Sequence, residues 1–174
     1  MLGVDVDHIS QLQGRLSILP QDALFQRNVP ILEQLAFFRV LDGKSQSEAE
    51  DEVQETLEKV GLAEYSKRGV HALSHGMLKR MGIAQAFLGN PEVILLDEPT
   101  SGMSGAETEQ AVALIRDISA TRTMVIVEHD MGVVFDLADR ISVLVYGQVI
   151  ATGTPEEIRA NAKVQKAYLG TEAD

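Results

Sequence analysis

The feature that most constrains the fold of this chain is the run Val93-Ile94-Leu95-Leu96, which is apolar at four consecutive positions without alternation. Such a run predicts a strand buried on both faces, which is typical of the centre of a parallel sheet covered by helices. We expect this strand over 92–96 and two more over 15–19 and 123–127, with amphipathic stretches between them. The pattern predicts an α/β fold with a mostly parallel sheet.

The last part of the chain has signals for a hairpin and a short helix. Two apolar segments, 141–146 and 149–152, flank Gly147-Gln148, which predicts two antiparallel strands around a tight turn. Pro155 and two acids follow Thr154, as is common in the first turn of a helix. We therefore expect a C-terminal hairpin followed by a helix.

Serine and glutamate pairs mark two helix starts in the middle of the chain. Ser47 with Glu50, and Ser104 with Glu107, have the capping-box spacing, in which hydroxyl and carboxylate each bind a free backbone N–H. The first helix is expected to run to Val60, because a glycine follows.

Composition limits the classes of protein to consider. With 174 residues and 45% hydrophobic content, we expect one domain. The net charge of −11 argues against a nucleic-acid or anionic-membrane partner. No apolar run approaches the roughly 20 residues that span a bilayer, and the start MLGVDVDHIS lacks signal-peptide features. We expect a cytoplasmic chain, without cysteine and hence without disulfides, whose membrane attachment comes only through a partner.

Two consecutive carboxylates follow the central strand. Asp97 and Glu98 would lie at the carboxyl end of a parallel sheet, where ligands bind, and could hold Mg2+ and position a water. They could equally cap the next turn. The pair alone leaves both interpretations open.

Four further motifs occur along the chain. Leu19-Pro20-Gln21 follows a predicted strand, and the segment 73–77, Leu-Ser-His-Gly-Met, opens a predicted helix over 74–88. Ser101 to Ser104 follows the acidic pair, and Glu128-His129-Asp130 follows the strand at 123–127. Each motif alone has an ordinary structural interpretation, such as a capped helix start or a surface histidine. Together with the acidic pair, from about residue 15 to 170, they resemble the Q-loop, signature, D-loop, H-loop and Walker B motifs of ABC ATPases.

This resemblance implies an ABC-type P-loop NTPase fold and MgATP hydrolysis. It implies a helical signature subdomain at about 22–90, with 10–21 and 91–174 forming the core sheet and C-terminal part. By resemblance, Asp97 and Gln21 belong to the Mg2+ environment, Glu98 polarises the attacking water, and His129 contacts the γ-phosphate.

The resemblance also implies partners. Two such domains would close head to tail, so that Ser74 and Gly76 serve the ATP held by a second ABC ATPase subunit, identical or different. A transmembrane permease would bind the chain at the inner face of the membrane. The segment from Phe25 to Phe38 is a candidate docking surface, and a core helix is an almost equal alternative.

The phosphate-binding P-loop of the family, G-x-x-x-x-G-K-[S/T], does not occur in the 174 residues. Gly43-Lys44-Ser45 resembles its end, but Phe38 stands where the first glycine is required and several acids follow. We interpret this segment as a turn and cap between two helices. We expect 1–174 to be a single ABC ATPase domain truncated at its N-terminus, with the chain alone unable to hold ATP.

Departures from the family motifs leave finer questions open. His75 replaces the first signature glycine, Met77 the usual glutamine, and Ser104 the usual D-loop aspartate. The segments 128–131, 147–158 and 167–170 resemble ATPases of branched-chain amino-acid importers. A non-transport ABC ATPase and a non-catalytic interaction module are the alternatives to a transporter subunit.

Overall fold

A sheet of three parallel strands forms the centre of the first part of the chain. The computed structural model describes residues 3–12 and 14–168. Its strands β1 (Leu16–Leu19), β2 (Val93–Asp97) and β3 (Thr123–Val127) lie in the order β1-β2-β3, with β2 in the middle. The predicted α/β class with a parallel sheet is confirmed. The prediction that β2 is buried on both faces is wrong, because only its alternate residues Ile94 and Leu96 are buried. β3 has the predicted bounds, whereas β1 and β2 each begin one residue later, after the exposed Arg15–Glu92 ion pair.

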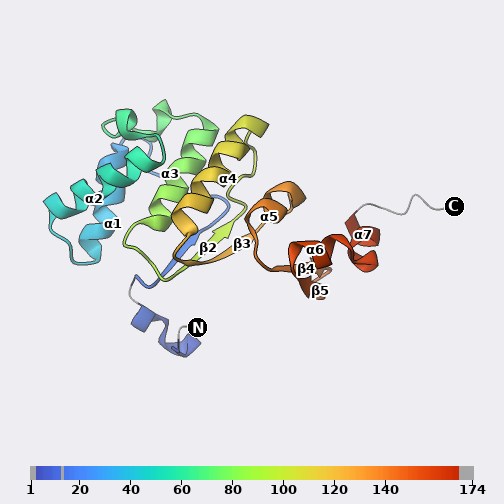
Figure 1. Cartoon of the computed structure of the whole chain (residues 1–174). Coiled ribbons are helices and arrows are strands. Elements are labelled where there is room, and N and C mark those ends of the chain that lie inside the picture. Colours follow the sequence, from blue (N-terminus) through green and yellow to red (C-terminus); the bar gives the residue numbers. More distant parts are fainter. Residues whose placement is uncertain (1–2, 13, 169–174) are drawn as a thin grey trace. The chain divides into compact units, whose positions relative to one another are not determined.

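Helices α3 (His75–Phe87) and α4 (Gly105–Ser119) pack beside each other, and α3 covers one face of the sheet (Figure 1). The side chains of Ile94 and Leu96 on this face are completely buried. α3 approaches β1 closely at Gly82, where an added Cβ would lie 2.8 Å from a methyl carbon of Leu19. This close packing fixes α3 against the strand that leads into the predicted Q-loop.

Helices α1 (Ile31–Leu41) and α2 (Gln46–Lys59) complete a small bundle with α3. On α2, the buried residues Ala49, Val53 and Leu57 recur every four positions, so that one stripe of an otherwise acidic helix faces the bundle. Short 3-10 helices at Ala63–Tyr65 and Val70–Ala72 link α2 to α3. The buried cluster of the bundle consists of Ile31, Leu35, Ala36, Ala49, Val53, Leu57, Val60, Leu62, Met81, Ala84 and Leu88.

The connection between α1 and α2 confirms one prediction and corrects another. Gly43-Lys44-Ser45 is a turn and cap, with Gly43 at φ +93°. The capping box, however, is Ser45 with Glu48, not Ser47 with Glu50. The Glu48 carboxylate accepts the backbone N–H and the hydroxyl of Ser45 at 3.0 and 2.6 Å, and these bonds, led by the hydroxyl, lower the Glu48 pKa. The left-handed turn at Gly43 lets the helix begin early, so Ser47 falls inside its first turn.

The assignment of Ser45 as the N-cap of α2 predicts that substitutions at Ser45 and Ser47 change the stability of the fold by different amounts. Ser45→Ala should lower the free energy of unfolding by about 1 kcal/mol, since it removes the N-cap hydroxyl. Ser47→Ala should change it little, because the exposed Ser47 does not cap α2. Urea unfolding followed by circular dichroism measures both. Equal losses in the two variants would contradict the assignment.

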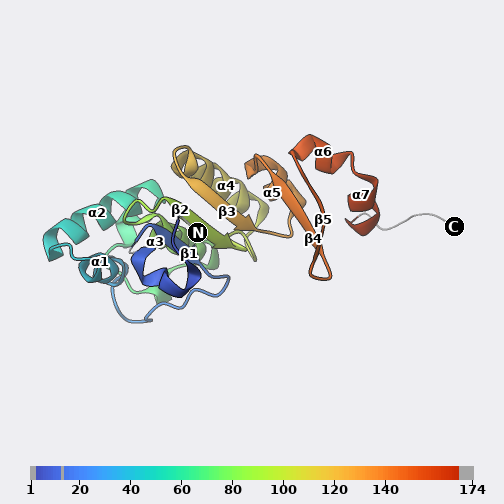
Figure 2. The ribbon, with the colours of Figure 1, turned by 90° about the horizontal axis from the view of Figure 1, so that it is seen from below.

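The described residues from Asp130 onward form a second compact unit. In it, α5 (Met131–Leu137) precedes the antiparallel hairpin of β4 (Ile141–Val145) and β5 (Gln148–Gly153), which Figure 2 shows side by side. Helices α6 (Pro155–Arg159) and α7 (Ala162–Tyr168) follow. A buried hydrophobic cluster of this unit consists of Ile141, Val143, Ile158 and Val164.

The predicted hairpin and the helix after Thr154 are confirmed, but the turn is Tyr146-Gly147 rather than Gly147-Gln148. Val145 pairs with Gln148, and the two turn residues have φ values of 48° and 76°. A two-residue hairpin loop favours positive φ at both positions, which fixes this register. The predicted division into parts at 22–90, 10–21 and 91–174 stays a prediction. Among the described residues, no helix is long and apolar enough to cross a membrane.

Candidate functional site

The carboxyl end of β2 turns sharply at Glu98. Its backbone is left-handed, with φ 45°, although it has a side chain. The N–H of Glu98 donates to the carbonyl oxygen of Val127 at 2.9 Å, and the N–H of Ser101 donates back to the carbonyl of Glu98 at 3.2 Å. A left-handed non-glycine residue costs about 1–2 kcal/mol and persists where surrounding contacts hold it, often at functional sites.

Three residues predicted from separate motifs meet at this turn. The side-chain amide of Gln21 donates to Oε2 of Glu98 at 2.6 Å. Nδ1 of His129 lies 3.5 Å from Oε1 of the same carboxylate. The Glu98 side chain is 26% exposed and that of His129 72%, so the cluster opens to solvent on the histidine side. Each of the three follows the end of one parallel strand, which explains why they gather at one edge of the sheet.

Lys79 joins this cluster from α3. Its ammonium donates to the backbone carbonyls of Gln21 at 3.0 Å and of Glu98 at 3.2 Å. One cation therefore ties together the two loops whose side chains form the Gln21–Glu98 bond. Sequence reasoning missed this role, because no local pattern shows that the second turn of α3 faces these loops.

Asp97 is the last residue of β2 and pairs with Val127 in the ladder. Within residues 3–12 and 14–168, no group of three or more histidine or acidic side chains is placed to hold a metal ion. Mg2+ is commonly held by one or two carboxylates together with phosphate oxygens and waters. Asp97, with Gln21 and Glu98 nearby in the fold, fits such a shared site and not a cage made by protein alone.

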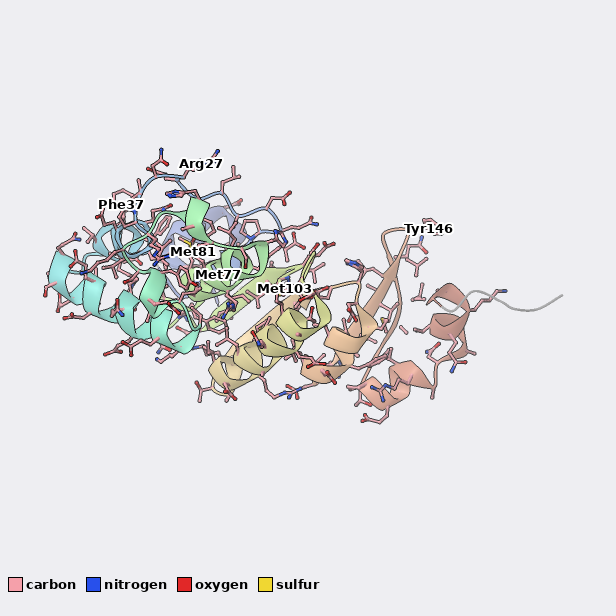
Figure 3. All side chains as sticks on the ribbon, turned by 90° about the horizontal axis from the view of Figure 1, so that it is seen from above. Arg27, Phe37, Met77, Met81, Met103 and Tyr146 are labelled. Carbon is pink, nitrogen blue, oxygen red and sulfur yellow. The ribbon has the colours of Figure 1, made fainter. Side chains whose placement is uncertain are left out.

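The predicted signature segment opens α3 as a capped helix. The hydroxyl of Ser74 accepts the N–H of Met77 at 3.2 Å, and the N–H of Ser74 points at the Met77 sulfur, 3.5 Å away. The Met77 thioether thus accepts the N-cap N–H in place of the glutamate or glutamine side chain of a usual capping box. Gly76 is buried, and a Cβ there would overlap the Glu107 carboxylate, which would have to move out of its bond with Ser104 to make room. Figure 3 shows Met77 and Met81 along α3, and Met103 beside the start of α4.

His75 links the start of α3 to the segment before α4. Its Nε2 lies 3.1 Å from the carbonyl oxygen of Ser101, a bond in which the ring nitrogen donates. A Cβ at Gly102 would lie 2.8 Å from the same nitrogen. The histidine that departs from the family pattern therefore binds the predicted D-loop within the same chain.

The predicted H-loop contributes a second contact to the turn after β2. Oε1 of Glu128 accepts both the N–H of Thr100, at 3.1 Å, and its hydroxyl, at 2.6 Å. Thr100 is only 6% exposed. Sequence reasoning assigned no role to Glu128, because this contact joins residues 28 positions apart.

A pocket with a largely apolar wall lies beside Gln21 and Lys79. Residues 19–25 form one side and residues of 70–82 the other. The residues that line it are Leu19, Pro20, Gln21, Asp22, Ala23, Leu24, Phe25, Val70, His75, Leu78, Lys79 and Gly82.

Glu107 carries the main pKa shift near the signature segment. Bonds from the backbone N–H and hydroxyl of Ser104, at 3.0 and 2.8 Å, lower the pKa of its carboxyl, with smaller contributions from Arg80 and His75. The predicted Ser104–Glu107 capping box is thereby confirmed.

This shift predicts a pH dependence. The folded pKa of Glu107 lies below its ordinary 4.5, so its cap stabilises the fold above that pH, and the stabilisation is lost as the pH falls through the folded-state pKa. Unfolding of the wild-type chain and of Glu107→Gln should therefore differ at neutral pH and converge in acid. A difference between the two proteins that does not shrink as the pH falls through the acid range in which the Glu107 carboxylate takes up its proton would contradict it.

Comparison with known proteins matches these features to one family. A family model described as ABC transporter matches residues 2–101, more than half of the chain. A second model, described as Branched-chain amino acid ATP-binding cassette transporter, matches residues 148–174. Both agree with the resemblances drawn from the motifs and from the tail.

Curated relatives are of the same kind. The chain is 40% identical over 129 residues to the high-affinity branched-chain amino acid transport ATP-binding protein LivG of Escherichia coli K12, covering 73% of this chain and 51% of LivG. It is 35% identical over 168 residues to the energy-coupling factor transporter ATP-binding protein EcfA of Methanothermobacter thermautotrophicus, covering 94% of this chain and 53% of EcfA. The chain thus spans about half the length of these relatives. With its parallel sheet, its clustered motif residues and the matched family model, the chain belongs to the ABC transporter family and has its P-loop NTPase fold.

Proposed function

We propose that the chain supplies the magnesium, water-activating and γ-phosphate-contacting part of an ATP-hydrolysing transporter subunit. The observation that carries the proposal is the cluster of Gln21, Glu98 and His129 at the carboxyl edge of the sheet. Ligands bind at this edge in open α/β sheets. Family membership makes ATP the nucleotide to test.

Within this cluster, the two oxygens of Glu98 have different surroundings. Oε2 accepts the Gln21 amide, whereas Oε1 faces His129 at 3.5 Å and is the oxygen left for a water. A carboxylate so placed orients the water and accepts its proton. His129, largely exposed, would donate to a γ-phosphate oxygen. Bound MgATP would supply the electrophilic phosphorus and the positive charge that stabilises the transferred group.

A second subunit would complete each nucleotide site. In the proposal, Asp97 and Gln21 hold Mg2+, while Ser74 and Gly76 at the start of α3 face the ATP of the partner ATPase. Free N–H groups at a helix N-terminus favour an anion. Phosphate binding in cis would come from a P-loop on a segment outside residues 1–174.

An exposed apolar surface supports a permease as the other partner. Leu24 is 95% exposed, and Phe37, Phe38 and Leu41 on the outer side of α1 are 42% to 67% exposed. Figure 3 shows Phe37 on the outside of the bundle. The opposite side of α1 belongs to the core, as the core-helix alternative predicted, and the exposed side supports the proposed docking. Docking there would place the subunit at the inner membrane face, and branched-chain amino acids are the first substrates to test.

A chimaera tests the proposal. Residues 1–174 are joined to the P-loop-bearing N-terminal segment of LivG, and MgATP binding and turnover are measured beside the 174-residue chain alone. We expect binding and turnover only in the chimaera. Binding by the chain alone would refute the need for an added P-loop, and a folded chimaera without turnover would refute the proposed function.

A further inference from the structure

We propose that Glu128 is a positioning residue that holds the turn carrying Glu98 in its left-handed conformation and thereby sets the approach of His129 to Glu98. The consequence for catalysis rests on the proposed function, whereas the structural role does not.

Besides its own bond from the Ser101 N–H to the Glu98 carbonyl, the turn has two contacts with the chain around the end of β3. At the start of the turn, the N–H of Glu98 is held by the carbonyl of Val127. Beyond Pro99, the N–H and hydroxyl of Thr100 have their acceptor in Oε1 of Glu128. The end of β3 and the residue after it therefore hold the turn at two points, through the backbone carbonyl of Val127 and through the side chain of Glu128.

The position of Glu128 in the chain connects its hydrogen bonds to Thr100 with the contact between Glu98 and His129. It lies between Val127, which holds Glu98 through the backbone, and His129, whose ring faces Glu98 at 3.5 Å. A shift of Thr100 away from Glu128 would move the turn relative to this short segment. The separation of Glu98 and His129 would change with it.

The surroundings of the two Glu128 oxygens show which chemical group the contact with Thr100 requires. Oε1 accepts both bonds, whereas Oε2 is buried and has no hydrogen-bond partner among the described residues. Only one acceptor oxygen is used. Glutamine keeps that oxygen and should replace Glu128, whereas a general base or metal ligand would require the carboxylate charge.

The experiment compares four variants of the 174-residue chain by NMR: Glu128→Met, Glu128→Gln, Thr100→Val, and the exposed control Glu109→Met. The rate of amide hydrogen exchange at Thr100, referenced to that of Ala111 in α4, reports on the hydrogen bonds to Glu128. The nuclear Overhauser contact between Glu98 and the His129 ring reports on the separation of these two side chains. In Glu128→Met, exchange at Thr100 should rise about tenfold and the contact should weaken, since two donors lose their acceptor. Glu128→Gln and the control should stay within about twofold of the wild type.

Unchanged exchange and contact in Glu128→Met would overturn the proposal, as would a Glu128→Gln variant that behaves like Glu128→Met. If Glu128→Met does not fold, Thr100→Val provides the test, because it removes only the hydroxyl donor. In that variant, a contact between Glu98 and His129 as strong as in the wild type would overturn the proposal. In the LivG chimaera, Glu128→Met should lower kcat with KM nearly unchanged, and Glu128→Gln should restore kcat. A chimaera without any turnover refutes the proposed function and leaves the exchange result standing.

Discussion

Glu98→Gln in the P-loop-bearing chimaera is expected to lower kcat for MgATP by about 10²–10⁴-fold and to leave MgATP binding unchanged. Glutamine has the size of glutamate, and its amide oxygen can still accept the Gln21 bond seen at 2.6 Å. The variant therefore keeps the geometry of the turn and loses only the group that can accept a proton from water. Binding should survive, because Glu98 is assigned to the water and not to the nucleotide.

Single-turnover kinetics and calorimetry with MgATP separate these two effects. Glu109→Gln, an exposed exchange of the same chemistry on α4, is the matched control and should retain turnover. Retained turnover in Glu98→Gln would remove Glu98 from its assigned role. A parallel loss of binding would instead show that the exchange disturbed the site as a whole.

The position of the site was predictable because it depends on strand ends. Gln21, Glu98 and His129 each follow a strand that its apolar run reveals, and parallel strands bring their carboxyl ends to one edge. Their meeting within hydrogen-bonding reach follows from this rule. Their chemical roles remain predictions for the experiments above.

Contacts that depend on tertiary packing were not predictable. Lys79 reaches the site because α3 packs on β1 at Gly82, and Glu128 reaches Thr100 because of the register between β2 and β3. Neither arrangement leaves a local pattern in the sequence.

The misplaced helix start has a local cause. Two overlapping serine and glutamate pairs, at 45/48 and 47/50, fit the same capping box. The backbone at Gly43 decides between them, because its left-handed conformation ends the preceding turn. The turn at Tyr146 was misplaced for a related reason, since a tyrosine at positive φ is a rare choice for a hairpin loop.

Leu35→Ala is expected to lower the free energy of unfolding by about 2–5 kcal/mol, the range for removing a buried leucine side chain from a close-packed core. Leu35 is completely buried in the cluster that α1 shares with α2 and α3. Leu41, on the same helix, is 67% exposed, so Leu41→Ala is the matched control and should cost only about 0.5 kcal/mol or less, as is usual for surface substitutions.

Urea unfolding monitored by helix content measures both variants, and equal losses would contradict the assigned burial of α1. The cluster also contains Met81 and Ala84 of α3, while Lys79 of the same helix binds the loops of Gln21 and Glu98. A loosened bundle should therefore also loosen the hold of α3 on the site. Faster amide exchange in the first turns of α3 in Leu35→Ala, absent in Leu41→Ala, would show that the bundle core positions the signature helix.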